Sequence, residues 1–247
     1  MDINGSTKQL QVGLLVIATG KYNEFLGPLT QSIEDHFMKN HEVIIHLFTD
    51  EPIAARRESR LQFKVIEIPS YKFPEATLLR YQIFSDAREK LEGDYLFYLD
   101  VDSLFVGNVG EEILIDGLTV TCHPGFYRDK GWGDMETKGN SIAYTPPASR
   151  VRYYCGGFQG GSFKDYLEAC VIMAQDIKED KHNGVMARWH DESHWNHYIN
   201  VIYSGYRQVL TPEYMMPEQQ ALRKAWKIDH FEPKILALSK NHKEIRA

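Results

Sequence analysis

Residues 94–105 read DYLFYLDVDSLF, in which a five-residue apolar run is followed by two aspartates separated by one valine. A short apolar run of this kind is typical of a strand that is buried on both faces of a sheet. Polar residues directly after such a strand lie at the edge where α/β sheets bind ligands. The stretch therefore predicts a buried strand at 95–99, with Asp100 and Asp102 at a ligand-binding edge.

Similar apolar runs come earlier in the chain. Residues 12–18, 43–48 and 63–68 are short, apolar and bounded by turn-forming residues, so each predicts a strand. Between them, residues 25–38 and 75–91 carry apolar side chains at helical spacing. Strands that alternate with helices predict an α/β fold with a mostly parallel sheet.

The second half of the chain is less regular. Residues 118–122 predict another strand, and residues 128–140, which are polar and glycine-rich, predict a loop. Residues 163–177 and 191–198 predict helices. No internal repeat or interdomain linker is evident, so we expect a single domain over residues 1–247.

The composition excludes several classes of protein. The 247 residues are 43% apolar and 25% charged, with a net charge of −6, which does not favour nucleic-acid binding. No apolar run approaches the roughly 20 residues of a membrane-spanning helix, and the polar first residues do not resemble a signal peptide. The three cysteines, at 122, 155 and 170, suit a reducing compartment. We therefore expect a cytoplasmic protein.

Asp100 and Asp102 are candidate metal ligands. Two carboxylates two residues apart on an extended segment point to the same side. Mn²⁺ and Mg²⁺ favour oxygen ligands of this kind and leave coordination positions open for substrate phosphates. A surface turn capped by aspartates would have the same spacing.

Residues 189–194, WHDESH, concentrate titratable side chains. His190 and His194 are four residues apart, which allows two imidazoles on a helix to share a zinc ion. The zinc-protease helix, however, has glutamate directly after the first histidine, where this chain has Asp191. Asp191 could instead cap a helix, with Glu192 in its first turn.

Four glycines lie in YYCGGFQGGS at 153–162. Glycine permits close approach of the backbone to a ligand, and a tight turn or a bulge explains the run equally well. The spacing fits neither the phosphate-binding P-loop nor the dinucleotide motif.

The C-terminal segment is basic. It could clamp a phosphate-bearing substrate, or it could be an ordinary solvated terminus. Its basic side chains are Lys234, Lys240, His242, Lys243 and Arg246.

Taken in order, several segments resemble glycosyltransferase family 6, the family of the blood-group A and B transferases and the α1,3-galactosyltransferases. The matching segments are HLFTD (46–50), DYLFYLDVDSLF (94–105), HPGFY (123–127), YYCGGFQGGS (153–162), WHDESHWN (189–196) and SKNHKEIR (239–246). The resemblance implies a GT-A fold, a single Rossmann-like domain with a mixed central sheet. Residues 12–105 would bind the nucleotide sugar, and residues 106–247 would bind the acceptor and supply a closing tail.

The resemblance also implies a retaining α1,3-glycosyltransferase that moves GalNAc or Gal from a UDP-sugar to a β-galactoside, plain or fucosylated. Asp100 and Asp102 would bind Mn²⁺, or Mg²⁺, and through it the UDP diphosphate. Val101 would lie against the ribose. The residues near the base would be Ile17, Thr19 and Tyr22.

The same resemblance places residues around the donor sugar. Arg80 would reach the sugar and the first aspartate, Asp191 would hydrogen-bond the hexose, and His190 would shape its pocket. The pocket would also be lined by Cys155, Gly156 and Gly157.

On the acceptor side, the resemblance assigns Glu192 to the reacting anomeric carbon and to the acceptor, and it assigns His123 and Trp189 to the galactoside. Lys240 and Arg246 would close over the diphosphate, so we expect the segment from about residue 239 to become ordered when UDP binds. Where family members often have YERR, this chain has METK at 135–138.

The position matching Gly157 is glycine in the blood-group GalNAc enzyme and alanine in the galactose enzyme. A missing Cβ leaves room for a 2-acetamido group, and Cys155 is smaller than its counterparts in both enzymes. We therefore predict UDP-GalNAc as the donor.

Two other functions fit parts of the sequence. One is a zinc-dependent hydrolase that uses His190, His194 and a third ligand such as His123 or His197. The other is a non-catalytic carbohydrate-binding module with an aromatic platform at Trp189 and Trp195.

Overall fold

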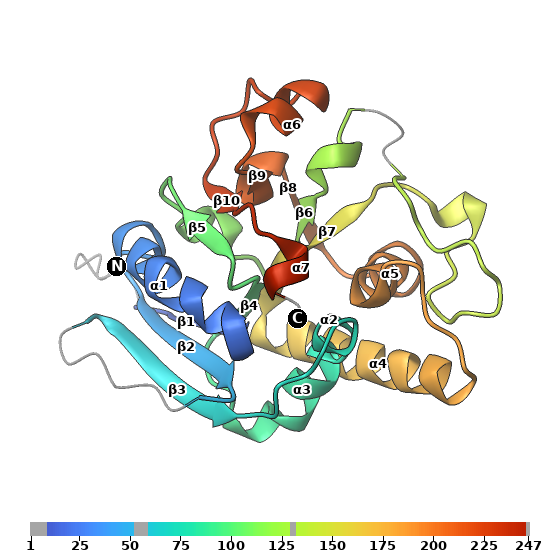
Figure 1. The fold of residues 1–247 in the computed structure, drawn as a ribbon, viewed down its shortest axis with the longest axis horizontal. Coiled ribbons are helices and arrows are strands. Elements are labelled where there is room, and N and C mark those ends of the chain that lie inside the picture. The colour runs from blue at the N-terminus through green and yellow to red at the C-terminus, as the bar shows by residue number, and fades with distance from the viewer. Residues whose placement is uncertain (1–8, 52–58, 129–131, 246–247) are drawn as a thin grey trace, which may run out of the picture.

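The computed structural model describes residues 9–51, 59–128 and 132–245. A seven-stranded sheet in the order β3-β2-β1-β4-β7-β6-β8 crosses the molecule (Figure 1). Its strands are β1 (Gln11–Ala18), β2 (Glu42–Thr49), β3 (Leu61–Glu67), β4 (Tyr95–Leu99), β6 (Leu118–Cys122), β7 (Tyr154–Ser162) and β8 (Arg207–Leu210).

The sheet is mixed, as the GT-A resemblance implied. β1 pairs in parallel with both β2 and β4, β2 with β3, and β6 with β8. Only β7 runs antiparallel to its neighbours, β4 and β6. Because β4 and β7 come from different halves of the chain, this pairing makes one continuous sheet and confirms the predicted α/β class.

The glycine run forms the strand β7, not a tight turn. A Cβ at Gly160 would lie 2.3 Å from Cδ1 of Phe97 and 2.4 Å from the carbonyl oxygen of Leu96 on the neighbouring strand. Glycine is therefore required for β4 and β7 to pack this closely. The pairing of β7 with β6 shifts register between Val120 and Cys122.

A smaller sheet has the strand order β5-β10-β9. Its strands are β5 (Ser103–Phe105), β9 (Met216–Pro217) and β10 (Ile235–Ala237). We did not anticipate these strands or β8, because segments of two to four residues are too short to show an alternating pattern.

Helices surround the main sheet (Figure 1). The α-helices are α1 (Leu26–His36), α2 (Glu75–Leu78), α3 (Arg80–Asp86), α4 (Phe163–His182), α5 (His190–His197), α6 (Gln220–Ala225) and α7 (His242–Ile245). The 3₁₀ segments are η1 (Gly20–Phe25), η2 (Arg88–Lys90), η3 (Glu111–Ile113), η4 (Pro124–Phe126), η5 (Pro147–Ser149) and η7 (Pro212–Met215), and the π-helical turn η6 is Tyr198–Ile202.

Two helix predictions need correction. The continuous helix expected at 75–91 is divided into α2, α3 and η2, because Leu79 and Ala87 have ψ near 1°, outside the helical range. The helix expected from Asp191 begins at His190 with Trp189 as its N-cap residue, so Asp191 lies in the first turn and is not the cap.

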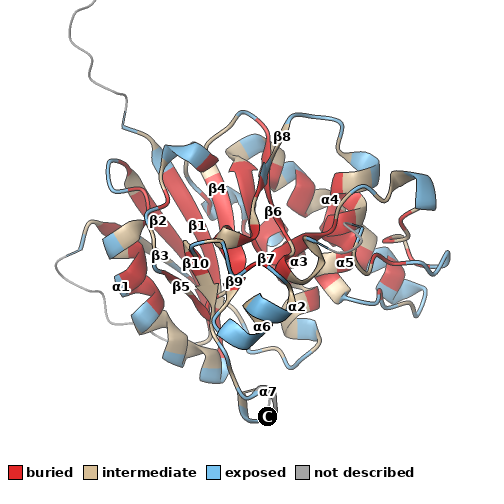
Figure 2. Cartoon of the chain, turned by 90° about the horizontal axis from the view of Figure 1, so that it is seen from above, coloured by how far each residue is buried: buried red, intermediate tan, exposed pale blue. Residues whose placement is uncertain are grey.

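Alternate side chains of β1 enter two apolar cores. Val12, Leu14 and Val16 pack with α1 on one face of the sheet, and Leu15 packs with α3 and α4 on the other. Figure 2 shows the buried strands between helices whose outer faces are exposed. Burial on both faces explains why these strands read as continuous apolar runs.

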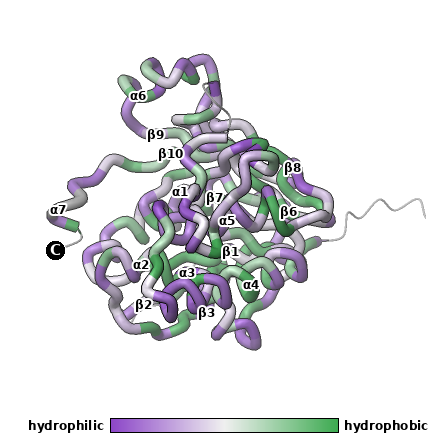
Figure 3. Tube along the Cα trace, turned by 90° about the vertical axis from the view of Figure 1, so that its right-hand side faces the viewer, coloured by the Kyte–Doolittle hydropathy of each residue, from purple (hydrophilic) through white to green (hydrophobic). Residues whose placement is uncertain are grey.

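In Figure 3, hydrophilic residues are spread over the surface helices, and the segment that carries α7 extends from the main body. Among the described residues, every helix is too short or too polar to cross a lipid bilayer.

Candidate active site

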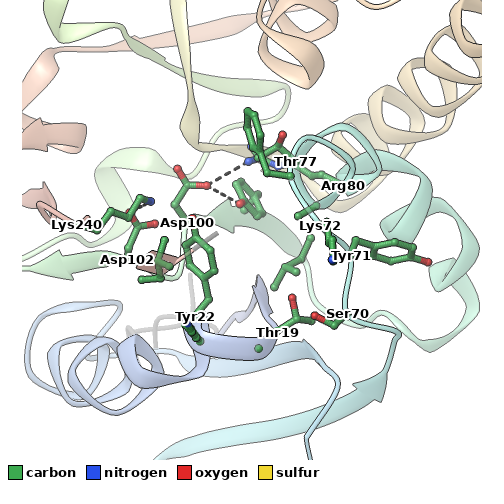
Figure 4. A pocket seen from close by; sticks show the side chains of 17 residues that line it. Thr19, Tyr22, Ser70, Tyr71, Lys72, Thr77, Arg80, Asp100, Asp102 and Lys240 are labelled. Carbon is green, nitrogen blue, oxygen red and sulfur yellow. Dashed lines mark hydrogen bonds and ion pairs between the residues drawn. The ribbon is translucent and has the colours of Figure 1, made fainter. Parts of the chain in front are cut away.

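A cavity of about 360 Å³ lies beyond the carboxyl ends of β1, β3 and β4 (Figure 4). Its lining includes seven residues that the sequence analysis singled out, namely Ile17, Thr19, Tyr22, Arg80, Asp100, Asp102 and Lys240. It also includes residues that the analysis missed, among them Ser70, Tyr71, Lys72, Phe73, Thr77 and Tyr98. Residues 70–73 follow β3 and so lie at the same edge of the sheet, a signal that could have identified them.

The turn after β1 is held by the residue after β2. Gly20 has φ +54°, a conformation that glycine adopts without strain. Its N–H donates to Oδ1 of Asp50 at 3.0 Å, and the side chain of Asn23 donates to the same oxygen. Asp50 therefore shapes the cavity wall around Thr19.

Asp100 and Asp102 project from the end of β4 into this cavity (Figure 4). The hydroxyl of Tyr98 donates to Oδ1 of Asp100 at 2.5 Å. Lys240 contacts Oδ2 of Asp102 and lies over the ring of Tyr22, 5.1 Å from its centroid. Burial, followed by the charge of Asp100, raises the pKa of Asp102, and Lys240 opposes this shift.

Arg80, the first residue of α3, connects three parts of the site. Its guanidinium lies 3.1 Å from Oδ2 of Asp191 and 3.2 Å from Oδ1 of Asp100, and it donates to the carbonyl oxygen of Gly156 at 2.7 Å. It also lies 3.9 Å from the centroid of the Tyr98 ring. Burial would lower the pKa of Arg80, but Asp191, Tyr98 and Asp100 together raise it, so the side chain is a fixed cation.

Asp191 and Glu192 occupy the first turn of α5. Burial raises the pKa of Asp191 to about 7; Arg80 opposes the shift, and Glu192 and Asp100 add to it. Glu192 accepts a hydrogen bond from the N–H of Gly156 at 2.7 Å. The backbone of Gly156 therefore accepts from Arg80 through its carbonyl oxygen and donates to Glu192 through its N–H.

Tyr153 is a site residue that sequence reasoning missed. It is 1% exposed, and its hydroxyl donates to Oε1 of Glu192 at 2.8 Å. Its ring packs edge-on against His123, with the ring centroids 5.6 Å apart. Burial lowers the pKa of His123 to about 4, and Nδ1 of this ring accepts the N–H of Gly125 at 3.1 Å. His123 is therefore neutral near pH 7, with the proton on Nε2.

Trp189, the N-cap residue of α5, is 47% exposed. Its indole N–H donates to Oδ2 of Asp134 at 3.0 Å. Nearby, Glu136, in the METK segment at 135–138, is 1% exposed and accepts backbone N–H bonds, including one from Arg188 at 2.6 Å. The predicted loop is thus fixed to the start of α5.

Other predicted residues lie around or outside the cavity. Val101 and Cys155 are 4% exposed and pack in the apolar core. The ring of His190 packs edge-on against Phe73, with centroids 5.3 Å apart. Lys234 is apart from the cavity and pairs with Glu112 at 2.8 Å, and Arg246 lies outside the described residues.

Gly157 lies directly beside the first aspartate. Its carbonyl oxygen accepts the N–H of Asp100 at 2.9 Å. A Cβ at this position would lie 2.8 Å from Oδ2 of Asp100 and 3.0 Å from Cε of Met215. The space that a side chain at 157 would fill is therefore bounded by the Asp100 carboxylate.

The donor set around Asp100 and Asp102 fits a small divalent cation. Both side chains offer carboxylate oxygens at one mouth of the cavity, and the ammonium group of Lys240 already contacts one of them. A cation in contact with Asp102 offsets the cost of burying its charge. Among the described residues, no group of three or more His, Cys, Asp or Glu side chains is arranged to hold a metal ion, so a bound substrate would have to supply further ligands.

The mixed seven-stranded sheet, with a cavity at its carboxyl edge, is consistent with a glycosyltransferase fold of the GT-A type. The chain belongs to glycosyltransferase family 6, whose model matches residues 3–247.

Three relatives illustrate the similarity. The chain is 37% identical to histo-blood group ABO system transferase 2 of Rattus norvegicus, over 95% of this chain and 71% of the rat protein. It is 32% identical to globoside alpha-1,3-N-acetylgalactosaminyltransferase 1 of Gallus gallus, over 96% of this chain and 69% of the chicken protein. It is 28% identical to the O-antigen biosynthesis glycosyltransferase WbnI of Escherichia coli, over 88% of this chain and 92% of that protein.

Family membership overturns the two other functions, and the geometry explains why. His194 is 1% exposed and faces Asp180, with Nε2 3.5 Å from the carboxylate, and His197 lies 2.7 Å from the carbonyl oxygen of Tyr144. These histidines therefore do not converge on a zinc site with His190. Trp195 is fully buried, so it forms no platform with Trp189.

Proposed function

We propose that this glycosyltransferase transfers GalNAc, and less efficiently Gal, from a UDP-sugar to a β-galactoside, plain or fucosylated. The new linkage would be α1,3, formed with retention of anomeric configuration. The proposal is supported by the names of relatives, which include globoside alpha-1,3-N-acetylgalactosaminyltransferase 1 and alpha-1,3-galactosyltransferase 2. The observation that carries it is the pair of hydrogen bonds made by the backbone of Gly156, which links Arg80 in the cavity wall to Glu192.

The donor would bind in the cavity, with its base near Ile17, Thr19 and Tyr22. Lys240 lies at the mouth of the cavity and would place a positive charge beside the diphosphate. Such charges stabilise the leaving group as the glycosidic bond breaks. Closure of the C-terminal tail, including Arg246, would exclude water and limit hydrolysis of the donor.

Asp100 and Asp102 would hold Mn²⁺, or Mg²⁺. When bound, the ion supplies Lewis-acid stabilisation of the diphosphate leaving group. Arg80 keeps the Asp100 carboxylate in place from the protein side and therefore orients it for this role.

Glu192 would act at the anomeric carbon. Its two oxygens are fixed by the N–H of Gly156 and the hydroxyl of Tyr153, so the carboxylate has one orientation. Retention follows if the carboxylate attacks the anomeric carbon from the face opposite UDP, forming a glycosyl–enzyme bond as the bond to UDP breaks, and the acceptor then displaces it. It also follows if the carboxylate stabilises an oxocarbenium-like centre that the acceptor attacks from the face that UDP leaves.

The acceptor would bind on the side of His123 and Trp189. The neutral ring of His123 has a proton on Nε2 that can be donated to a sugar hydroxyl. The exposed part of Trp189 offers an apolar surface to a sugar ring. One catalytic domain would thus bind the nucleotide sugar with residues 12–105 and the acceptor with residues 106–247.

The deciding experiment is a screen for UDP release. UDP-GalNAc and UDP-Gal would each be incubated with lactose or with a fucosylated galactoside, with Mn²⁺ or with chelator. We expect acceptor-dependent UDP release that requires Mn²⁺ and a product whose anomeric proton has the small coupling constant of an α linkage. A β-linked product, or the absence of turnover with both donors, would contradict the proposal.

A further inference from the structure

Residues 132–138, here called the acceptor-side segment, lie against Arg188 and Trp189, which directly precede α5. Gly133 has φ +57° and packs on the ring of Tyr153, so closely that a Cβ there would come within 2.3 Å of Tyr153 Cγ. Only glycine permits this approach. The segment therefore lies against the tyrosine that hydrogen-bonds Glu192.

The next residue, Asp134, holds two side chains at once. Oδ2 accepts the indole N–H of Trp189 at 3.0 Å, and Oδ1 lies 2.8 Å from Nη1 of Arg188. The side chain of Asp134 is 29% exposed, whereas that of Arg188 is 51% exposed. The carboxylate thus fixes one edge of the indole and leaves much of Trp189 open to solvent.

Asp134 is presented on a fixed backbone. The buried carboxylate of Glu136 accepts the N–H groups of Thr137 and Lys138, each at 2.8 Å, and that of Arg188 at 2.6 Å. Hydrogen bonds to a charged acceptor are stronger than neutral ones. The acceptor-side segment and the residue before Trp189 are therefore held at a fixed separation.

We propose that Asp134 is a positioning residue that sets the affinity for the acceptor through Trp189. By bonding the indole edge, it holds the open ring face ready to stack on the C–H face of a galactopyranoside. A half-exposed indole without this bond would sample several rotamers, and acceptor binding would then have to order it. The inference rests on the proposed function, because it concerns the acceptor of that reaction.

The first test is the variant Asp134→Asn, which has nearly the same shape but lacks the charge. We expect the KM for lactose to rise about tenfold, because the neutral amide oxygen of asparagine accepts the indole N–H more weakly than a carboxylate does and cannot pair with Arg188. The kcat and the Kd for UDP-GalNAc should not change. Asp116→Asn, an exposed aspartate before β6, is the matched control. General destabilisation of the site would lower kcat as well. A raised KM with an unchanged kcat therefore distinguishes a loss of acceptor positioning from destabilisation.

A double-mutant cycle identifies the route. Trp189→Phe keeps an aromatic face and removes the N–H that Asp134 accepts. If Asp134 acts through the indole, adding Asp134→Asn to Trp189→Phe will not change the KM further, so the double variant will have the KM of Trp189→Phe and not the product of both effects. If the two substitutions raise the KM for lactose independently, or if Asp134→Asn leaves this KM unchanged, the inference about Asp134 is wrong and the proposed function still stands. Absence of transfer by the unaltered protein would overturn the proposed function and this inference together.

Discussion

The hydroxyl of Tyr153 donates a 2.8 Å hydrogen bond to Oε1 of Glu192, while the N–H of Gly156 donates to Oε2 at 2.7 Å. Burial raises the pKa of Glu192, and these two donors oppose the rise by stabilising the charged form. The two donors thus stabilise the charged form of the carboxylate and orient it.

Replacing Tyr153 by phenylalanine should therefore raise the pKa of Glu192. If transfer requires ionised Glu192, activity is lost as the pH falls through this pKa, so the acid limb of the kcat profile should move to higher pH. The measurement is kcat against pH for Tyr153→Phe and for Tyr154→Phe, the neighbouring control whose ring packs in the apolar core beside α3 and α4. Superimposable acid limbs for Tyr153→Phe and the unaltered protein would show that this bond does not tune Glu192.

Glu192→Gln should lower kcat by about 10²- to 10⁴-fold, because the negative charge at the anomeric carbon is lost while the shape is kept. Its affinity for UDP should not change, since Glu192 is not among the residues that line the cavity. Transfer rates and calorimetric UDP binding test the two halves of this prediction. Near-normal turnover would mean that Glu192 has been assigned the wrong role.

Asparagine at both Asp100 and Asp102 should remove most of the Mn²⁺-dependent turnover. Amide groups keep the size of the side chains but lose the charge that attracts a divalent ion. Titration of Mn²⁺ into the unaltered protein and the double variant, by turnover and by direct metal binding, measures this loss. Full activity of the unaltered protein in excess chelator would rule out the metal requirement.

Gly157→Ala should shift the donor preference from UDP-GalNAc toward UDP-Gal, because an added methyl group crowds the 2-acetamido group. A difference of this size usually changes discrimination by about 1–3 kcal/mol. Since the new Cβ would also press on Asp100, we expect a lower kcat with both donors. The ratio of kcat/KM for the two donors separates these effects. A clear preference of the unaltered protein for UDP-Gal would refute the donor assignment.

Arg80→Met should destabilise the fold by about 3–5 kcal/mol near neutral pH, because it leaves Asp191 buried without its cation. The raised pKa of Asp191 means that the folded state binds more protons than the unfolded chain between about pH 4 and 7, so stability falls as the pH rises through this window. Without Arg80 the pKa of Asp191 rises further, so the deficit should be larger at alkaline than at acidic pH. Urea unfolding of the variant and of the unaltered protein near pH 4 and near pH 7 measures the difference in their free energies of unfolding. A difference that does not change with pH would contradict the role of Arg80 as the cation that compensates buried Asp191.

Much of the first half of the fold could be predicted from sequence. The strands expected at 12–18, 43–48 and 95–99 agree with β1, β2 and β4 to within about one residue at each end. They are buried on both faces, so their apolar runs are local and unambiguous. The aspartates after β4 were identifiable for the same reason, because the end of a buried strand is itself a local signal.

Sequence alone did not reveal β7 as a strand or Tyr153 and Asp134 as site residues. Glycine has no side chain, so β7 lacks an alternating pattern, and its conformation depends on packing against β4. Tyr153 and Asp134 bond residues 39 and 55 positions away. Local propensity and spacing therefore determined the strands and the acidic edge, whereas the orientation of Glu192 and Trp189 was decided only when tertiary packing brought distant hydrogen-bond partners together.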